Sequence, residues 1–543
     1  MTQPTRSALI KDSALAEAYE TVTYTGYPYA QTHPDRLATV ATLFGMNPAP
    51  VDHCRVLEVG CGDGGNLIPM AFTLPESSFV GIDLAPSTIA RGQEMIAQLG
   101  LRNIELSCED ILSFESSGQF DYIIAHGVFS WVPEEVREKI LEICRGLLAP
   151  HGVAYISYNT YPGYRLREVT REMMRFHVRG IADPSDRVSH GLTLLKFLLQ
   201  KFPGEGQARS DLYGALLYEQ LDLLTRHRHP EQIYHDDLAD LNTPFYFRDF
   251  VGQAECHGLK YLAEADYFEM QDYIYPQPIR EFLGQFGDEQ VVLKEQYLDF
   301  IKCRTFRQTL LCHREAPVSR SIDPRKLASF YLESQARAVA PEPDLSANAL
   351  EEFRGLRDAR MQTDYPLAKA ALLVLGESWP RSLTWDELTK LAYARLGDAE
   401  KANREPSFDD EVIMLAEILV AACGSDLVRM RMQPPMFVTE VRERPLASPL
   451  ARMQASRGGM VTNLMHKSVE IEDDLGRELF QLLDGTRTRA ELCDEMVLII
   501  LERSLFKRAD GSMVDDQREL QSIIASAVDV NLKKIAGMAL LVG

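Results

Sequence analysis

Between positions 55 and 158 the chain alternates short apolar runs, many of them β-branched, with stretches of helical periodicity. Short apolar runs bounded by turns favour buried strands, and strands that alternate with helices favour a parallel sheet covered on both faces. The predicted strands are Arg55–Val59, Phe79–Asp83, Asn103–Ser107, Tyr122–Ala125 and Val153–Tyr158. Helices are predicted after Gly65, after Pro86 and over Pro133–Leu147. We therefore predict an α/β domain with a Rossmann-like sheet.

After Asn159 the pattern becomes helical without intervening strands. The predicted helices are Tyr164–Gly180, His190–Lys201 and Asp211–Thr225, and we interpret them as a helical insertion. An amphipathic helix, Phe247–His257, follows. Two later apolar runs, Leu259–Ala263 and Thr305–Cys312, are β-compatible, and we expect them to form an antiparallel pair that completes the first sheet.

Proline-containing segments at 317–324 and 340–343 are typical of connections and predict a domain boundary near 316. Beyond it, three helices (Pro366–Leu375, Leu383–Leu396 and Phe408–Cys423) and a strand (Leu427–Met432) predict a small winged-helix-like unit. A further module follows Val461. The predicted organisation is an N-terminal helical and aromatic segment over the active site (1–50), a cofactor-binding core (51–164), the insertion (165–245), a segment that completes the sheet (246–315), the middle helical, winged-helix-like module (316–445) and a mostly helical C-terminal module (446–543).

The composition and net charge of the chain exclude some classes of function and favour others. With 45% hydrophobic and 25% charged residues, the 543-residue chain has the composition of a globular protein of several domains. Nine scattered cysteines without a C-x-x-C pair favour neither disulfides nor a zinc site, and we expect no metal. No apolar run reaches the about 20 residues of a membrane span, and the polar start is unlike a secretory signal, so we expect a cytoplasmic protein without membrane insertion. The net charge of −22 disfavours nucleic acid as a partner and would attract a lysine-bearing polypeptide.

A glycine-rich motif, Gly60-x-Gly62-x-x-Gly65, follows the first predicted strand. Glycines let the chain turn tightly there and bring backbone N–H groups against a ligand at a helix N-terminus. The same motif marks nicotinamide and flavin enzymes, in which an acid such as Asp83, about 20 residues farther on, holds a ribose. The motif alone therefore does not separate a dehydrogenase from other enzymes that bind an adenosyl cofactor.

Three further features point away from a dehydrogenase. Glu58 ends the first strand, where a carboxylate suits a cationic ligand without phosphates. The segment Cys108-Glu109-Asp110-Ile111 lies at the end of the third predicted strand. A carboxylate there can accept a hydrogen bond from an adenine amino group. The segment from Asp121 to Pro133 resembles the fourth strand and following loop of class I S-adenosylmethionine-dependent methyltransferases. The predicted cofactor-binding residues are Glu58, Gly60, Cys61, Gly62, Asp83, Leu84, Glu109, Asp110, Ile111, His126 and Val128.

Further segments resemble one bacterial family along most of the chain. These are Tyr24-x-x-Tyr27-Pro28-Tyr29-x-x-Thr32-His33-Pro34-Asp35-Arg36-Leu37, Tyr158-Asn159-Thr160-Tyr161-Pro162-Gly163-Tyr164, the stretch from Arg248 to Ala265, and 482–487. They resemble methyltransferases with a methyltransferase regulatory domain, which include the rickettsial protein-lysine methyltransferases that act on outer membrane protein B. The resemblance implies methyl transfer and, beyond it, a lysine target. Tyr164 stands where the family pattern has a tryptophan.

A lysine substrate requires a site that binds its ammonium group and then favours its neutral form, which aromatic burial does. Candidates for this pocket are Tyr24, Tyr27, Tyr29, Trp131 and Tyr161. His33 and His126 are candidate proton relays, although His126 is expected mainly at the cofactor, and Asn159 is the candidate for orienting the amine. The predicted catalytic residues are His33, Asn159 and Tyr29. Two alternatives stay open, a small-molecule methyltransferase and a non-catalytic regulator that binds the cofactor. A homodimer is compatible with either.

Overall fold

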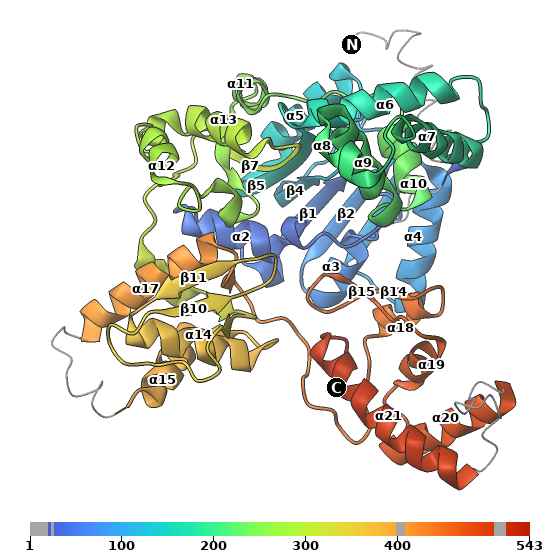
Figure 1. Ribbon diagram of the computed structural model, residues 1–543, viewed down its shortest axis with the longest axis vertical. Coiled ribbons are helices and arrows are strands. Elements are labelled where there is room, and N and C mark those ends of the chain that lie inside the picture. Colours follow the sequence, from blue (N-terminus) through green and yellow to red (C-terminus); the bar gives the residue numbers. More distant parts are fainter. Residues whose placement is uncertain (1–19, 23–25, 398–407, 504–516) are drawn as a thin grey trace.

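The largest unit of the protein is a seven-stranded sheet with the order β3-β2-β1-β4-β5-β7-β6 (Figure 1). The computed structural model describes residues 20–22, 26–397, 408–503 and 517–543. The strands of the sheet are β1 (Arg55–Val59), β2 (Ser78–Asp83), β3 (Ile104–Cys108), β4 (Phe120–Ala125), β5 (Leu148–Asn159), β6 (Leu259–Glu264) and β7 (Phe306–His313). All five strands predicted for the core are present, and β5 begins earlier than predicted, at Leu148.

The first five strands are parallel, and β7 runs antiparallel between β5 and β6. Ile156 of β5 lies opposite Thr309 of β7, and Tyr261 of β6 lies opposite Leu311. This register confirms the predicted antiparallel pair and places it in the same sheet as β1. The insertion therefore separates two parts of one domain.

Alternate residues of the strands enter two different cores, as the two-residue period of a strand requires. On one face Tyr122 and Ile124 pack with α2 (Pro34–Leu43), α3 (Leu67–Thr73) and α4 (Pro86–Leu99). On the other face Ile123 and Ala125 pack with α5 (Glu134–Leu147) and α11 (Phe247–Cys256). The helices thus cover both faces and leave the carboxyl ends of β1, β2 and β4 at one edge.

The insertion between β5 and β6 is a helical unit with a core of its own, which includes Met174, Val178, Leu195 and Leu217. Its helices are α6 (Tyr164–Val178), α7 (Pro184–Leu199), α8 (Glu205–Ser210), α9 (Leu212–Arg226) and α10 (Pro230–Gln232). Two further helices, α12 (Gln277–Leu283) and α13 (Val291–Lys302), precede β7.

The middle module packs against the α2 side of the sheet, and its buried residues continue the same hydrophobic core. Its helices are α14 (Pro366–Ser378), α15 (Trp385–Arg395) and α17 (Phe408–Gly424), beside a sheet of β12 (Leu383–Thr384), β8 (Tyr331–Glu333) and β13 (Arg429–Arg431). A second sheet of β9 (Arg337–Ala338), β10 (Glu351–Arg354) and β11 (Arg360–Thr363) was not predicted. Its strands are short and charged, and Arg357 and Asp358 adopt the positive φ of the connecting turn without the usual glycine or asparagine.

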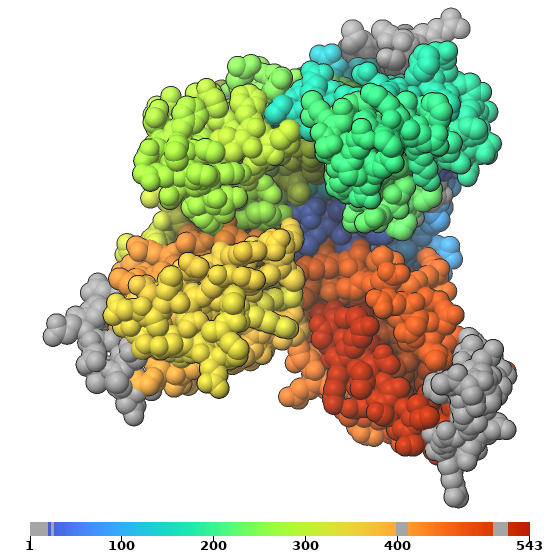
Figure 2. Space-filling view, viewed as in Figure 1, coloured from blue at the N-terminus to red at the C-terminus, as the bar shows by residue number. Residues whose placement is uncertain are grey.

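The C-terminal module has a separate core, which includes Leu479, Phe480, Leu492 and Leu532. It consists of α18 (Pro449–Ala455), β14 (Met460–Thr462), β15 (Ser468–Glu470), α19 (Asp474–Leu482), α20 (Arg489–Arg503) and α21 (Gln517–Gly537). In the space-filling view the insertion, the α12–α13 region, the middle module and the C-terminal module form four lobes around a hollowed centre (Figure 2). Within the described ranges, none of the helices has the length and apolar character needed to span a membrane.

Candidate functional site

The glycine loop leaves β1 and is held against β2 by its backbone. The N–H groups of Gly60 and Cys61 donate to Ile82 O at 2.8 and 3.0 Å. Gly60 has a φ of +72°, and a Cβ there would lie 2.4 Å from Val128 Cγ2, so only glycine fits. Gly65 lies against the backbone of Gly26, which a Cβ would approach to 2.4 Å. The loop is therefore enclosed by the β4 loop on one side and by the N-terminal segment on the other.

Asp83, at the end of β2, fixes this loop. Its Oδ2 accepts from Gly62 N–H at 2.9 Å and its Oδ1 from Ala85 N–H at 3.0 Å. Burial raises its pKa, and the backbone N–H groups act in the opposite direction. A carboxylate oxygen can accept more than one hydrogen bond, so Asp83 keeps lone pairs for a ligand's hydroxyl groups.

Glu58 lies buried at the end of β1, where it begins a chain of hydrogen bonds. Its Oε1 accepts from Asn66 Nδ2 at 2.8 Å, while its buried Oε2 has no partner in the described part of the chain. Burial raises the pKa of Glu58 to about 8. Asn66 Oδ1 in turn accepts from Tyr29 N–H at 2.9 Å. Glu58 therefore has one oxygen fixed by Asn66 and one without a protein partner in the described part of the chain.

The segment after β3 forms the adjacent wall. Glu109 N–H donates to Asp83 O at 3.0 Å, and Asp110 Oδ1 accepts from Leu112 N–H at 2.9 Å. Ile111 is buried in the core. Of the other predicted cofactor residues, Leu84 is half-buried, and the Cys61 thiol is buried beside Gly81, so that burial raises its pKa well above the usual value.

The end of β4 carries His126, which lies among aromatic and hydroxyl groups. Its Nδ1 lies 3.0 Å from Tyr155 Oη and 3.2 Å from Ser157 Oγ. The centroids of the His126 and Tyr29 rings are 3.9 Å apart. Burial lowers the pKa of His126 to about 4, so the imidazole is neutral near pH 7. Tyr29 thus reaches the same edge of the sheet as the glycine loop.

Asn159 ends β5 and is held by its neighbours. Its backbone N–H donates to Ser130 Oγ at 2.9 Å, and its Nδ2 donates to Asn242 Oδ1 at 2.9 Å. Its Oδ1 accepts no hydrogen bond from a protein group among the residues that the structure describes. Trp131 follows Ser130 in the chain and is half-buried, with the guanidinium carbon of Arg171 at 5.9 Å from its ring centroid.

Three predicted pocket residues remain, Tyr161, Tyr27 and Tyr24. Tyr161 Oη donates to Glu168 at 2.9 Å, and Arg165 lies 3.8 Å above its ring, so one face of this ring is already covered. Tyr27 is half-buried, and burial raises its pKa. Tyr24 lies outside the described residues.

His33 has a structural position. It is the N-cap of α2, where its Nδ1 accepts from Asp35 N–H at 3.1 Å, and its ring centroid lies 5.1 Å from that of His466. Burial lowers the pKa of His33 to about 3. Because its Nδ1 lone pair is used and its ring faces the C-terminal module, we assign no proton transfer to it.

Four residues of this region were missed from the sequence: Asn66, Tyr155, Ser157 and His466. Asn66 directly follows the glycine motif, so its position at the start of α3 was a usable signal. His466 has no such signal, because it meets Asn66 only through tertiary packing. In the described ranges no cluster of three or more histidine, cysteine or acidic side chains could hold a metal ion.

Three family models match the chain. They are a methyltransferase domain over residues 57–154, a predicted methyltransferase regulatory domain over 229–313 and a PKMT C-terminal winged helix domain over 443–540. The winged-helix description thus falls on the C-terminal module, whereas the sequence pattern assigned it to the middle module.

A relative and a solved structure each match nearly the whole chain. An uncharacterized protein of Rickettsia prowazekii (strain Madrid E) is 31% identical over 533 residues, which are 96% of this chain and 93% of that protein. The structure of PKMT2 from Rickettsia typhi in complex with AdoHcy is 30% identical, with a TM-score of 0.82. The match covers 96% of this chain and 100% of that one.

Proposed function

The chain belongs to the class I S-adenosylmethionine-dependent methyltransferases that carry a methyltransferase regulatory domain and a PKMT C-terminal winged helix domain, and we propose that it methylates lysine side chains of a protein substrate. The proposal has two parts. The chain binds S-adenosylmethionine, and its acceptor site suits an amine.

The residues at the carboxyl edge of the sheet fit S-adenosylmethionine. This cofactor carries cationic groups and a ribose, without phosphates. The buried, unpaired Glu58 Oε2 would hold a cation, and Asp83 would accept from the ribose hydroxyls. Asp110 and the neighbouring Glu109, which follow β3, would accept a hydrogen bond from the adenine amino group. When bound, S-adenosylmethionine supplies an electrophilic methyl group.

The observation that carries the lysine proposal is the free acceptor at Asn159 Oδ1. Methyl transfer needs a neutral amine about 3 Å from the methyl carbon with its lone pair aligned. Asn159 is held rigidly by Ser130 and Asn242, so its Oδ1 is positioned to accept an N–H of the amine and to set its direction. The half-buried rings of Tyr29 and Trp131 attract an ammonium group and, by excluding water, favour the loss of its proton.

The modules beyond the sheet support a polypeptide substrate. The four lobes around the hollowed centre give a surface larger than a metabolite requires (Figure 2). With 79 acidic against 57 basic residues, the chain attracts a lysine-rich partner. The solved structure reported above is named PKMT2, and its similarity to this chain supports the same substrate class.

The test is a methylation assay with isotope-labelled S-adenosylmethionine and a lysine-rich protein, with the label mapped by mass spectrometry. We expect label on lysine Nζ. Asn159→Ala should lower kcat at least tenfold and leave the affinity for S-adenosylmethionine unchanged. Asn242→Ala is the matched control, because it removes a support of Asn159 but keeps Oδ1, and it should lose less activity. Label on arginine, on carboxylates or only on small acceptors would contradict a lysine target.

A further inference from the structure

Six aromatic rings form a continuous surface that starts near the end of β5. We call this surface the aromatic track, and in order along it the residues are Tyr161, Tyr246, Phe300, Tyr297, Phe282 and Phe286. Neighbouring ring centroids are 4.9 to 6.3 Å apart, within the usual range of contacting aromatic pairs. Tyr161 lies two positions beyond Asn159 in the chain. The track therefore begins close in the chain to the residue that we expect to orient the target amine.

Backbone pairing brings the first two rings together. Phe245 N–H donates to Asn159 O at 3.0 Å, and Tyr161 N–H donates to Phe245 O at 2.9 Å. The segment before α11 is thus held against the segment after β5. Tyr246, which follows Phe245, is 36% exposed, so its ring is accessible to a ligand.

The outer part of the track lies on α13. Leu293, Tyr297 and Phe300 follow the i, i+4, i+7 spacing that places side chains on one face of a helix. Such an apolar face is usually buried, but the buried side of α13 is the opposite one, which carries Leu298 and Asp299. Leu293 is 39% and Phe300 46% exposed. The helix therefore presents a second apolar face to solvent.

The spacing of the rings suits an extended polypeptide. Side chains on one face of an extended chain recur about every 6.6 Å, because successive residues point to opposite faces. The steps of 4.9 to 6.3 Å between the rings are close to this repeat. An extended segment laid along the track can thus place every second side chain against a ring.

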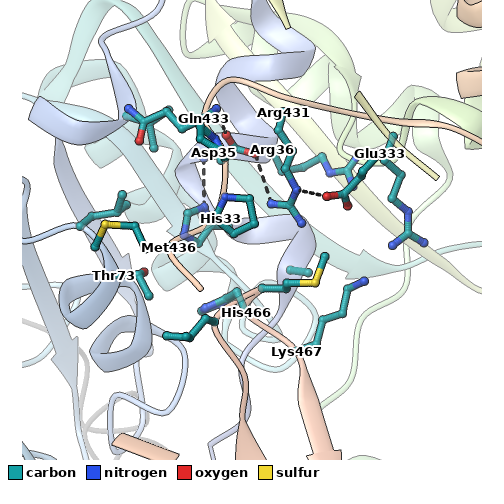
Figure 3. Close-up of a pocket in the computed structure, with 18 of the residues that line it drawn as sticks. His33, Asp35, Arg36, Thr73, Glu333, Arg431, Gln433, Met436, His466 and Lys467 are labelled. Atoms are coloured by element: carbon teal, nitrogen blue, oxygen red, sulfur yellow. Dashed lines mark hydrogen bonds and ion pairs between the residues drawn. The ribbon is translucent and has the colours of Figure 1, made fainter. Parts of the chain in front are cut away.

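The track is separate from the cavity at the junction of α2, the middle module and the C-terminal module. This cavity has a volume of about 390 Å³, and in its wall Arg431 pairs with Glu333 and Asp35 (Figure 3). None of the six rings lines it. The track lies on open surface instead, which fits a segment of a polypeptide better than a small molecule.

The charges beside the track are balanced along α13 and acidic at its far end. Basic side chains of the same region are held in ion pairs of 2.7 to 3.1 Å: Arg165 with Glu168, Arg248 with Asp249, Lys294 with Asp272 and Lys302 with Glu269. The charged residues of α12 and of the turn after it are three acids and one base: Glu281, Asp288, Glu289 and Arg280. The rings therefore favour apolar side chains, and the far end favours a basic chain.

We propose that the aromatic track binds the part of the protein substrate next to its target lysine, in extended form and with alternate apolar side chains against the rings. This inference rests on the lysine methylation proposed above. The track starts two residues from Asn159 and ends at the acidic α12, which suits further basic residues of the same polypeptide. The choice of substrate then depends on apolar residues at alternate positions beside the lysine, and not on the lysine alone.

Two synthetic peptides test the track. Both have a central lysine, and one carries leucine at the second and fourth positions on each side with serine elsewhere, while the other carries only serine. We expect the leucine peptide to bind the full chain about tenfold or more tightly in fluorescence anisotropy. Phe300→Ala and Phe282→Ala should each lower this preference about threefold or more. Phe176→Ala and Phe197→Ala should keep it, because these exposed phenylalanines lie on the insertion, outside the track.

The outcomes separate the track from the lysine target. Equal binding of the two peptides, or a preference that both track variants keep, would refute the track. If Phe300→Ala dissociates a dimer in sedimentation and leaves the peptide preference unchanged, the rings contact a second copy of the chain and the proposal is wrong. Methylation of the same peptides with labelled S-adenosylmethionine is read separately. A track-dependent preference without label on lysine supports the track and contradicts the lysine target, whereas labelled lysine without any preference does the reverse.

Discussion

His466 Nε2 lies 2.9 Å from Asn66 Oδ1, so the C-terminal module is hydrogen-bonded directly to the first residue after the glycine loop. The same Asn66 donates to Glu58 at the end of β1. The buried side-chain amide of Asn66 therefore connects the C-terminal module to β1, the strand that ends in Glu58 and Val59.

The first prediction follows from this contact. His466→Ala removes one donor to Asn66, whose oxygen keeps its bonds from Tyr29 N–H and Thr32 Oγ1, so the loss is that of one hydrogen bond, about 0.5–1.5 kcal/mol. We expect a lower melting temperature and a weaker affinity for S-adenosylmethionine, measured by thermal unfolding and calorimetry. His53→Ala is the control, because the His53 side chain is 68% exposed. If His466→Ala keeps the melting temperature and the affinity for S-adenosylmethionine, the hydrogen bond between His466 and Asn66 does not couple the C-terminal module to the cofactor site.

Asp83 gives the second prediction. Asp83→Ala removes the acceptor of Gly62 N–H and of the ribose hydroxyls, and charge-assisted bonds of this kind contribute about 1.5–3 kcal/mol. The affinity for S-adenosylmethionine should fall about 10- to 150-fold in calorimetric titration. Glu105→Ala, an exposed acid on the neighbouring β3, should bind normally. A normal affinity in Asp83→Ala would remove this residue from the cofactor site.

Glu58 gives a prediction on pH. Its pKa rises from 4.5 to about 8 on folding, so the folded state binds one proton more than the unfolded state between these values. The contribution of Glu58 to the free energy of unfolding is then fully present below pH 4.5 and decreases as pH rises towards 8. The slope is at most about 1.4 kcal/mol per pH unit.

The measurement is thermal unfolding of the cofactor-free protein between pH 5 and 8.5. Glu58→Gln should flatten the decline with pH, because glutamine does not titrate. Glu76→Gln, at an exposed position, should keep the profile of the original protein. Identical profiles for Glu58→Gln and the original protein would mean that Glu58 is already ionised when folded.

The sequence predicted the sheet and the cofactor edge because both depend on local order along the chain. Glycines after β1 and acids after β2 and β3 lie at one edge of any parallel sheet, whatever surrounds it. The junction between modules could not be predicted in this way. Asn66 and His466 lie 400 positions apart, and nothing in the sequence near either residue indicates the other. The partners of His33 were not predictable for the same reason, since they are a helix N-terminus and the C-terminal module, and its role in proton transfer stays a prediction.

Trp131 gives the last prediction, which concerns the acceptor pocket. It directly follows Ser130, whose hydroxyl accepts from the backbone N–H of Asn159, so Trp131 belongs to the loop that contacts the end of β5. An ammonium group over a tryptophan ring contributes about 0.5–2 kcal/mol. Trp131→Ala should therefore raise KM for a lysine-bearing protein about 2- to 30-fold and leave the affinity for S-adenosylmethionine unchanged. Trp131→Phe keeps an aromatic face and should recover part of the loss, which a purely structural role for the indole would not predict. Steady-state methylation kinetics with both variants decide the matter, and an unchanged KM in Trp131→Ala would place the lysine elsewhere.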